Sequence, residues 1–230
     1  MNSGPDIRIR KYIKYTHLIR EDIRKIMQRF GLKPEKIRIC DFGCGSGITT
    51  FALSLELDKS ICIELDKFSG DFQYSLDEIR KLENHLCNYC SNNLMNKLRI
   101  GEKTAIDLCQ LMADNRLPSF IRGDIVTGSN LPRDIGLAFC QRIFINIKKG
   151  KQGKKRAEQE NLLRAIENIV NSLSDGGYLL SIEFAKFELI PSLKECGLEI
   201  IEYFDFNRHD VRSRGRTNVL SHYTAYLCQK

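Results

Sequence analysis

The sequence predicts a three-layer α/β fold with a mostly parallel sheet of seven strands. Two observations support this prediction: short apolar segments alternate with amphipathic ones, and the 230 residues are enough for one sizeable core. Strands that alternate with helices form a parallel sheet with helices on both faces. The last two predicted strands have no helix between them, so the sheet should end with an antiparallel strand. No repeat or linker divides residues 1–230, and we expect a single domain.

The N-terminal half should contain two helix–strand pairs and a helical insertion. Apolar residues spaced three and four apart predict the first helix, which Gly31 ends, and residues 1–34 should form an N-terminal helical segment. The expected elements are a helix at 12–30, a strand at 37–42, a helix at 48–57 and a strand at 59–65. Residues 69–118 are mostly helical by composition, and we expect a helical insertion or cap there.

The C-terminal half continues the alternation. The expected elements are strands at 119–122 and 135–147, a helix at 157–173, a strand at 178–184, a short helix at 191–196 and strands at 198–206 and 223–228. Gly176 and Gly177 predict a tight turn before the fifth strand. Four aromatic residues of the last two strands should pack in the core. They are Tyr203, Phe204, Phe206 and Tyr223.

The composition is that of an ordinary globular protein. Hydrophobic residues make up 42% of the chain and charged residues 28%, which argues against disorder. No segment approaches the roughly 20 apolar residues that a membrane-spanning helix needs. The charged N-terminus lacks the apolar core of a signal peptide. We therefore expect a cytoplasmic protein without a membrane partner, in which the nine cysteines are reduced thiols.

A glycine loop follows the first predicted strand and opens the second helix. Its sequence, DFGCGSG at 41–47, lets the backbone turn tightly and approach a ligand at the helix N-terminus. The glycines are Gly43, Gly45 and Gly47. Asp41 would repel a pyrophosphate but suits a ligand that carries an ammonium and a sulfonium. Glu64, at the end of the second strand, is placed to bind both hydroxyls of a ribose.

The loop resembles the first motif of the class I S-adenosylmethionine-dependent methyltransferases, which have a Rossmann-like fold. The resemblance covers about residues 35–230, and LSDGGYLL at 173–180 resembles the family's entry to the fifth strand. It implies that Glu64 binds the ribose of the cofactor, that Leu65 packs on the adenine and that Asp124 accepts the adenine amino group. S-adenosylmethionine would then be the cofactor and S-adenosylhomocysteine the product.

The methyl acceptor should lie near the end of the fourth strand. Methyl transfer from a sulfonium is an in-line displacement, which needs a base only when the acceptor must lose a proton. The segment FCQRIFINI at 139–147 contains Cys140, expected beside the cofactor as a buried thiol and not as a nucleophile, and Arg142, a catalytic candidate. This segment is similar to the fourth strand of the chemotaxis receptor methyltransferases, which esterify glutamate, although Ile143 replaces their asparagine.

Two basic clusters suggest the chemistry of the acceptor. Six positive charges lie at 148–156 with no acid among them, and four arginines lie at 208–216. In a parallel sheet both loops should leave at the carboxyl edge, around the ligand crevice, and attract an anionic substrate. Such a substrate is a small acidic or phosphorylated metabolite, a protein carboxylate or RNA. The basic residues lack the interleaved aromatic side chains that favour RNA.

Further site residues are assigned from the positions expected for their segments. The first helix is in a position to fold over the cofactor pocket, and the arginine-rich loop should face the crevice. The resulting candidates are His209 for catalysis, together with Arg142, and Tyr15, His17, Arg212 and Arg214 for substrate binding. Cys87 and Cys90 form a CxxC pair, but tetrahedral zinc needs four ligands, so we expect buried thiols and no metal.

The sequence thus predicts methyl transfer from S-adenosylmethionine to an anionic small-molecule or protein acceptor. Two alternatives stay open, namely an RNA methyltransferase and a cofactor-binding subunit without catalytic activity. No motif specifies the acceptor atom or the oligomeric state.

Overall fold

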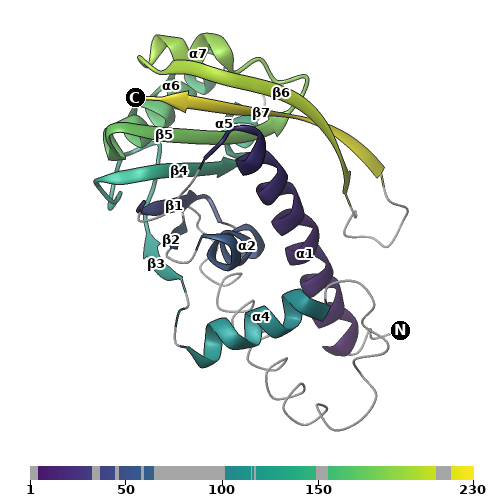
Figure 1. Ribbon diagram of the computed structural model, residues 1–230. Helices are drawn as coiled ribbons and strands as arrows, with labels where there is room; N and C mark the ends of the chain where they lie inside the picture. Colours follow the sequence, from purple (N-terminus) through teal and green to yellow (C-terminus); the bar gives the residue numbers. More distant parts are fainter. Residues whose placement is uncertain are drawn as a thin grey trace, which may run out of the picture.

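A sheet of seven strands forms the centre of the computed structural model (Figure 1), which describes residues 5–32, 37–44, 47–57, 60–64, 102–114, 116, 118–148, 155–210 and 219–230. From one edge to the other the strands are β3 (Ser119–Arg122), β2 (Ser60–Glu64), β1 (Ile39–Phe42), β4 (Ile135–Gln141), β5 (Leu173–Phe184), β7 (Val219–Gln229) and β6 (Glu199–Asp210). The first five pair in parallel, whereas β7 runs antiparallel between β5 and β6. This topology confirms the predicted sheet.

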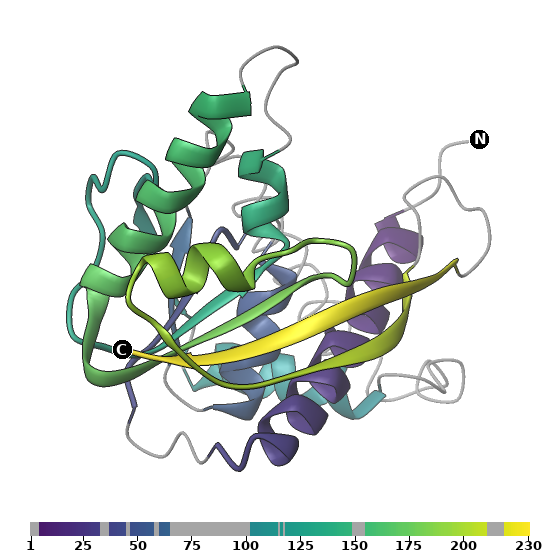
Figure 2. The same cartoon turned by 90° about the horizontal axis from the view of Figure 1, so that it is seen from above.

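Helices cover both faces of the sheet (Figures 1 and 2). One face carries α1 (Pro5–Arg29), α2 (Ile48–Glu56) and α4 (Glu102–Ala113), and the other carries α5 (Ile143–Lys148), α6 (Lys155–Ser172) and α7 (Ile190–Glu195). Alternate strand residues enter the two cores, so that Ile39 packs with α1 and α2 whereas Cys40 packs with α6. The three layers confirm the predicted architecture. Within the described residues, no helix has the length and apolar character needed to cross a membrane.

The insertion expected at 69–118 is described only in its last part. Residues 65–101 lie outside the described residues, and α4 is the helix that follows them. At the N-terminus, α1 begins at Pro5, earlier than the predicted start at Tyr12. A proline is tolerated in the first turn of a helix, because the amide it lacks has no partner there.

The fourth strand is shorter than predicted. It ends at Gln141, and the following residues form α5 instead of continuing the strand to Ile147. Arg142 turns the chain with a φ of 60°, and the Glu183 carboxylate accepts a hydrogen bond of 3.0 Å from the Phe144 amide in the first turn of α5. The prediction was wrong because an uninterrupted apolar run fits a buried strand and a buried helix equally well.

The predicted turn before the fifth strand is a bulge within that strand. β5 begins at Leu173, opposite Ile135, and the regular ladder resumes at Tyr178. Gly176 has a φ of 72°, in the left-handed region. A Cβ atom on Gly177 would lie 2.9 Å from the carbonyl oxygen of Ile135. The two glycines therefore let the chain bulge without leaving the sheet.

The aromatic residues of the last two strands do not all enter the core. Tyr223 is fully buried, and Phe204 and Phe206 are half-buried on the side of the sheet that faces α1. Tyr203 is 56% exposed, so its predicted core position was wrong. The reason is that β6 is an edge strand, whose alternate side chains point to opposite faces of the sheet.

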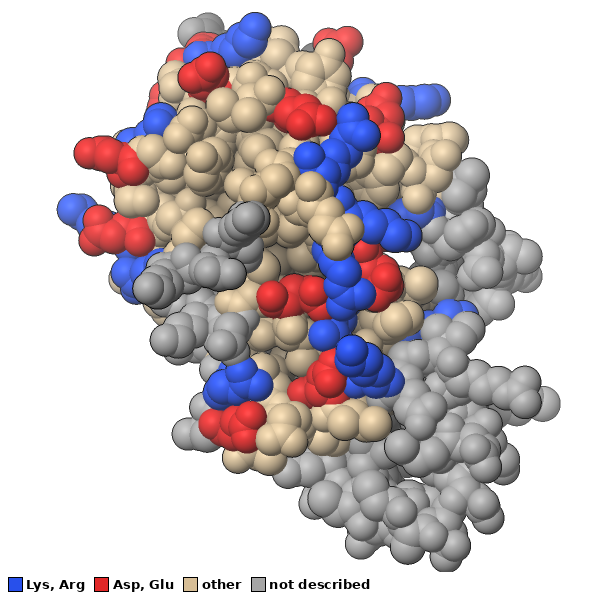
Figure 3. Space-filling view, in the orientation of Figure 1, with Lys and Arg blue, Asp and Glu red and all other residues tan. Residues whose placement is uncertain are grey.

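A cluster of charges holds α1 against α2 and α4. Basic side chains run along α1 with acidic side chains beside them (Figure 3). Arg20, which is 8% exposed, donates hydrogen bonds to the carboxylates of Glu56 on α2 and Asp107 on α4. Arg24 donates to the same Glu56 through Nε and Nη2, at 3.1 and 2.7 Å. One carboxylate therefore compensates two guanidinium groups.

Replacing Glu56 with alanine should lower the free energy of unfolding by about 3 kcal/mol, because a buried arginine loses part of its charge compensation. Glu202→Ala is the matched control, since it removes the partner of Arg29, an arginine of the same helix whose side chain is 57% exposed. The control should cost less than about 1 kcal/mol. Urea denaturation measures both losses, and equal losses would contradict the role assigned to the buried cluster.

Candidate functional site

The glycine loop joins β1 to α2 at the edge of the sheet where the parallel strands have their carboxyl ends. Gly43 and Gly47 have φ values of 77° and 75°, in the left-handed region that side chains disfavour. Gly47 precedes α2, and its carbonyl oxygen accepts a hydrogen bond of 2.9 Å from the Phe51 amide. Gly45 lies outside the described residues. The described part of the loop is the strand–turn–helix that the sequence predicted.

Asp41 lies on the α2 side of β1 and is 1% exposed. Its Oδ2 atom accepts a hydrogen bond of 2.6 Å from the Thr50 hydroxyl in the first turn of α2. Burial raises the pKa of the Asp41 carboxyl to about 7, although the bond from Thr50 acts in the opposite direction. A cationic ligand at the loop would favour the ionised carboxylate and offset part of the cost of its burial.

Glu64 and Asp124 lie at the carboxyl ends of β2 and β3, the two strands on one side of β1. Glu64 is the last residue of β2, opposite Arg122 of β3, and its side chain is not among those the structure describes. Asp124 follows β3, and its Oδ1 atom accepts a hydrogen bond of 2.8 Å from the Val126 amide. Asp124 therefore shapes the turn in which it lies. Leu65, predicted to pack on an adenine, lies outside the described residues.

Cys140 is a core residue of β4. It is fully buried, and it pairs with Phe42 of β1 and Ser181 of β5. Desolvation raises the pKa of its thiol well above the ordinary value, and the nearby carboxylates of Asp41 and Glu183 act in the same direction. The thiol therefore stays protonated, which argues against a nucleophilic role. Its contact with a cofactor stays a prediction.

Strand β5 holds Arg142 at the end of β4. The Arg142 amide donates a hydrogen bond of 2.9 Å to the Ile182 carbonyl oxygen, and its guanidinium lies 4.8 Å from the centre of the Phe184 ring. Glu183, which lies between Ile182 and Phe184 in the sequence, is buried. Burial raises the pKa of its carboxyl to about 7, although hydrogen bonds from the backbone amides of α5 act in the opposite direction. Arg142 itself is exposed, so its charge is accessible at this edge of the sheet.

A chain of polar side chains joins β6, β4 and α2 at the carboxyl ends of the parallel strands, and no pattern in the sequence predicts it. In the orientation of the Gln141 amide that gives both its ends a partner, its oxygen accepts hydrogen bonds from Arg208 Nη1 and Nη2, at 2.7 and 2.9 Å. The amide nitrogen of Gln141 then donates to the Thr49 hydroxyl at 2.8 Å. Thr49 and Gln141 are 92 residues apart, so no local spacing signals their contact.

The β6–β7 hairpin reaches this edge and is longer than predicted. β6 continues to Asp210 and β7 begins at Val219, so His209 belongs to a strand and not to the loop in which it was expected. The prediction was wrong because arginine-rich segments suggest a loop, although charged residues are common on edge strands. Arg212 and Arg214 lie outside the described residues, as do residues 149–154 of the basic run. The convergence of the two clusters stays a prediction.

Helix α1 carries the remaining sequence candidates, Tyr15 and His17. The Nδ1 atom of His17 lies 3.1 Å from the Thr104 hydroxyl of α4, so the imidazole helps to join the two helices. Tyr15 is half-buried on the same helix. A role for either side chain in binding substrate stays a prediction.

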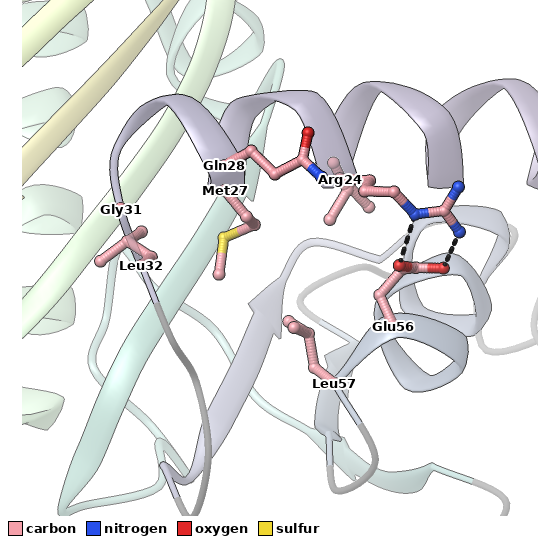
Figure 4. A pocket seen from close by; sticks show the side chains of 8 residues that line it. Arg24, Met27, Gln28, Gly31, Leu32, Glu56 and Leu57 are labelled. Atoms are coloured by element: carbon pink, nitrogen blue, oxygen red, sulfur yellow. Dashed lines mark hydrogen bonds and ion pairs between the residues drawn. The ribbon is translucent and has the colours of Figure 1, made fainter.

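A groove lies between the C-terminal ends of α1 and α2 (Figure 4). It has a volume of about 390 Å³, and Met27, Leu32, Leu57 and the ion pair of Arg24 with Glu56 form part of its wall. The glycine loop is at the opposite end of α2. The groove is therefore distinct from the candidate cofactor site.

Asp41→Asn should stabilise the ligand-free protein at neutral pH. The folded-state pKa of about 7 lies above the ordinary 3.8, so the unfolded chain loses its proton first and stability falls as pH rises between these values. Asparagine keeps an acceptor for Thr50 and removes this penalty, which is at most about 4 kcal/mol. Thermal unfolding from pH 4 to pH 8 should show a gain that vanishes toward the acidic end.

Asp175→Asn is the control, because Asp175 is exposed on the bulge before the regular part of β5. It should leave the pH dependence unchanged. An Asp41→Asn protein that is no more stable than the wild type at pH 8, or a gain that the control reproduces, would count against the prediction.

Several solved structures share this fold at low sequence identity. A S-adenosylmethionine-dependent methyltransferase from Clostridium acetobutylicum has a TM-score of 0.52 and 13% identity, covering 95% of this chain and 91% of its own. One from Methanosarcina mazei has a TM-score of 0.52 and 15% identity, covering 85% and 93%. A protein provisionally assigned as an RNA methyltransferase from Pyrococcus horikoshii has a TM-score of 0.53 and 18% identity, covering 92% and 83%.

No family model matches the sequence, and no curated protein is significantly similar to it. At identities of 13 to 18% the structural likeness concerns the fold. The chain has the Rossmann-like fold of the class I S-adenosylmethionine-dependent methyltransferases.

Proposed function

We propose that this protein transfers a methyl group from S-adenosylmethionine to an acceptor with anionic groups. The observation that carries the proposal is the buried carboxyl of Asp41 beside the glycine turn, with its pKa raised to about 7. The Thr50 hydroxyl offsets little of the cost of burying this charge, and a cationic ligand would offset more. S-adenosylmethionine has an ammonium group, and when bound it supplies a methyl group on an electrophilic sulfonium.

The acids at the carboxyl edge fit the parts of this cofactor in strand order. Asp41, near the end of β1, is assigned to the ammonium, and Glu64 at the end of β2 is assigned to the ribose hydroxyls. Asp124, after β3, is assigned to the adenine amino group through its second oxygen, because Oδ1 already accepts a backbone hydrogen bond. The three positions lie on adjacent strands, as a ligand extended along the edge requires.

The acceptor is assigned to the side of Arg142, at the end of β4. This arginine is exposed, and its amide and its guanidinium both contact β5, so its charge is held in place. A guanidinium recognises carboxylate and phosphate groups through paired hydrogen bonds. An acceptor oxygen that is already ionised needs no base, so the chain's task is to orient it toward the methyl group and to exclude water.

Calorimetry should show that the wild-type protein binds S-adenosylmethionine and S-adenosylhomocysteine. Asp41→Asn and Glu64→Gln should each raise the dissociation constant about tenfold or more, because each removes a charge-assisted hydrogen bond. Asp175→Asn, the exposed control, should bind like the wild type. No binding by the wild type would refute the proposed function, and unchanged affinity in both site variants would refute the site.

A labelled-methyl assay on cell extract, separated into small-molecule, protein and RNA fractions, should show incorporation into a carboxylate- or phosphate-bearing small molecule or a protein. Arg142→Gln should lower the rate about tenfold at low salt, because one charged contact to the acceptor is lost. Arg29→Gln, which removes an exposed charge at the far end of α1, should leave the rate unchanged.

Incorporation into RNA with a steep dependence on salt would favour the RNA alternative. Binding without incorporation into any fraction would favour the non-catalytic one.

A further inference from the structure

Arg208 stands at a junction of four structural elements. It comes from β6 and is 9% exposed. Its guanidinium donates two hydrogen bonds to Gln141 at the end of β4 and lies 4.5 Å from the centre of the Tyr223 ring on β7. Its Nη1 atom is 3.8 Å from the Asp22 carboxylate on α1. The cation is therefore almost removed from water, with Gln141 and Asp22 among its partners.

The contact with Gln141 continues to the cofactor loop. In the amide orientation in which Gln141 accepts from Arg208, its nitrogen donates to the Thr49 hydroxyl at 2.8 Å. Thr49 is the second residue of α2, between Gly47, which precedes the helix, and Thr50, whose hydroxyl binds Asp41. The orientation of Gln141 is set by Arg208, since a guanidinium has donors but no acceptor. Arg208 is thus connected to the first turn of α2 through the side chain of Gln141.

The contact with Tyr223 continues to the side of the crevice assigned to the acceptor. The Tyr223 ring stacks on Phe184 with centroids 5.0 Å apart and an angle of 20°. Arg142 lies over the Phe184 ring at 4.8 Å. The two arginines are therefore joined through a stacked pair of rings from β5 and β7.

Another arginine shows what a purely structural link between α1 and β6 looks like in this protein. Arg29 of α1 forms an ion pair of 3.1 Å with Glu202 of β6 and lies 4.6 Å from the centre of the Phe204 ring. It is at the end of α1 away from the glycine loop, and its side chain is 57% exposed. Arg208 bridges the same two elements through Asp22, but it is buried and also donates two hydrogen bonds to Gln141. Burying a cation is a costly way to join two elements.

We propose that Arg208 is a positioning residue, which fixes Gln141 and Thr49 and thereby holds the first turn of α2 in the orientation that binds the cofactor. The proposal rests on the proposed function for its ligand, S-adenosylmethionine. It assigns to a residue of β6 a role in a cofactor site that is otherwise built from β1 to β4.

The test compares Arg208→Gln with Arg29→Gln, since both variants remove a bridge between α1 and β6. Arg208→Gln should raise the dissociation constant for S-adenosylmethionine about tenfold, whereas Arg29→Gln should leave it unchanged. Hydrogen exchange without ligand should be about tenfold faster at the Phe51 amide in Arg208→Gln alone, because the first turn of α2 loses its support. Thr49→Val, an isosteric change that leaves Arg208 and Gln141 in place, should reproduce the loss of affinity.

Three results would overturn the proposal. Equal effects of Arg208→Gln and Arg29→Gln on both measurements would mean that Arg208 only joins the two elements. Full affinity in Arg208→Lys would mean that charge alone suffices, because an ammonium lacks the planar pair of donors that Gln141 accepts. Unchanged affinity in Thr49→Val would break the link to α2, and this variant decides the matter if Arg208→Gln fails to fold. If the wild type binds no cofactor, the proposed function fails, and the exchange at Phe51 still tests the positioning.

Discussion

The burial of Asp41 against the first turn of α2 is the constraint on which the geometry of the carboxyl edge depends. A carboxyl that is 1% exposed has to keep its proton or meet a cation, because the Thr50 hydroxyl offsets little of the desolvation. The bond to Thr50 also joins β1 to the first turn of α2, directly after the glycine turn. The charge at the end of β1 and the shape of the loop are therefore coupled, and a ligand that ionises Asp41 also strengthens the bond that orients the helix.

Glu183 meets the same physical problem in a different way. Its pKa is also raised to about 7 by burial, but its Oε1 atom accepts a hydrogen bond from the Phe144 amide at the start of α5. That bond ties the beginning of α5 to β5, and Arg142 lies in the turn between β4 and α5. Glu183 thus supports the segment that carries the accessible arginine, whereas Asp41 contacts the first turn of α2. The two buried carboxyls therefore tie two different helices to the ends of their strands.

The parts of the site that the sequence predicted are those encoded in consecutive residues. A strand, a glycine turn and a helix follow one another at 39–56, and the left-handed φ values at Gly43 and Gly47 explain why glycine is needed there. The end of β4 was misplaced because the helical residues of α5 are as apolar as a buried strand. The contacts of Gln141 with Arg208 and Thr49 could not be predicted from the sequence. They depend on how β6, β4 and α2 pack, and only the assembled fold brings these elements together.

The distribution of charge along the edge gives the proposed reaction a direction. Acids lie at or near the ends of β1 and β2 and directly after β3, whereas Arg142 follows β4 and Arg208 lies on β6 beside β7. Methyl transfer from a sulfonium to an anionic oxygen cancels one positive and one negative charge, so a site with little water favours the transition state over the separated charges. In the proposed site the thioether product would keep its ammonium and hence its attraction to Asp41. The methylated acceptor would have lost the charge that attracts it to Arg142, so the proposed arrangement would release the acceptor more readily than the spent cofactor.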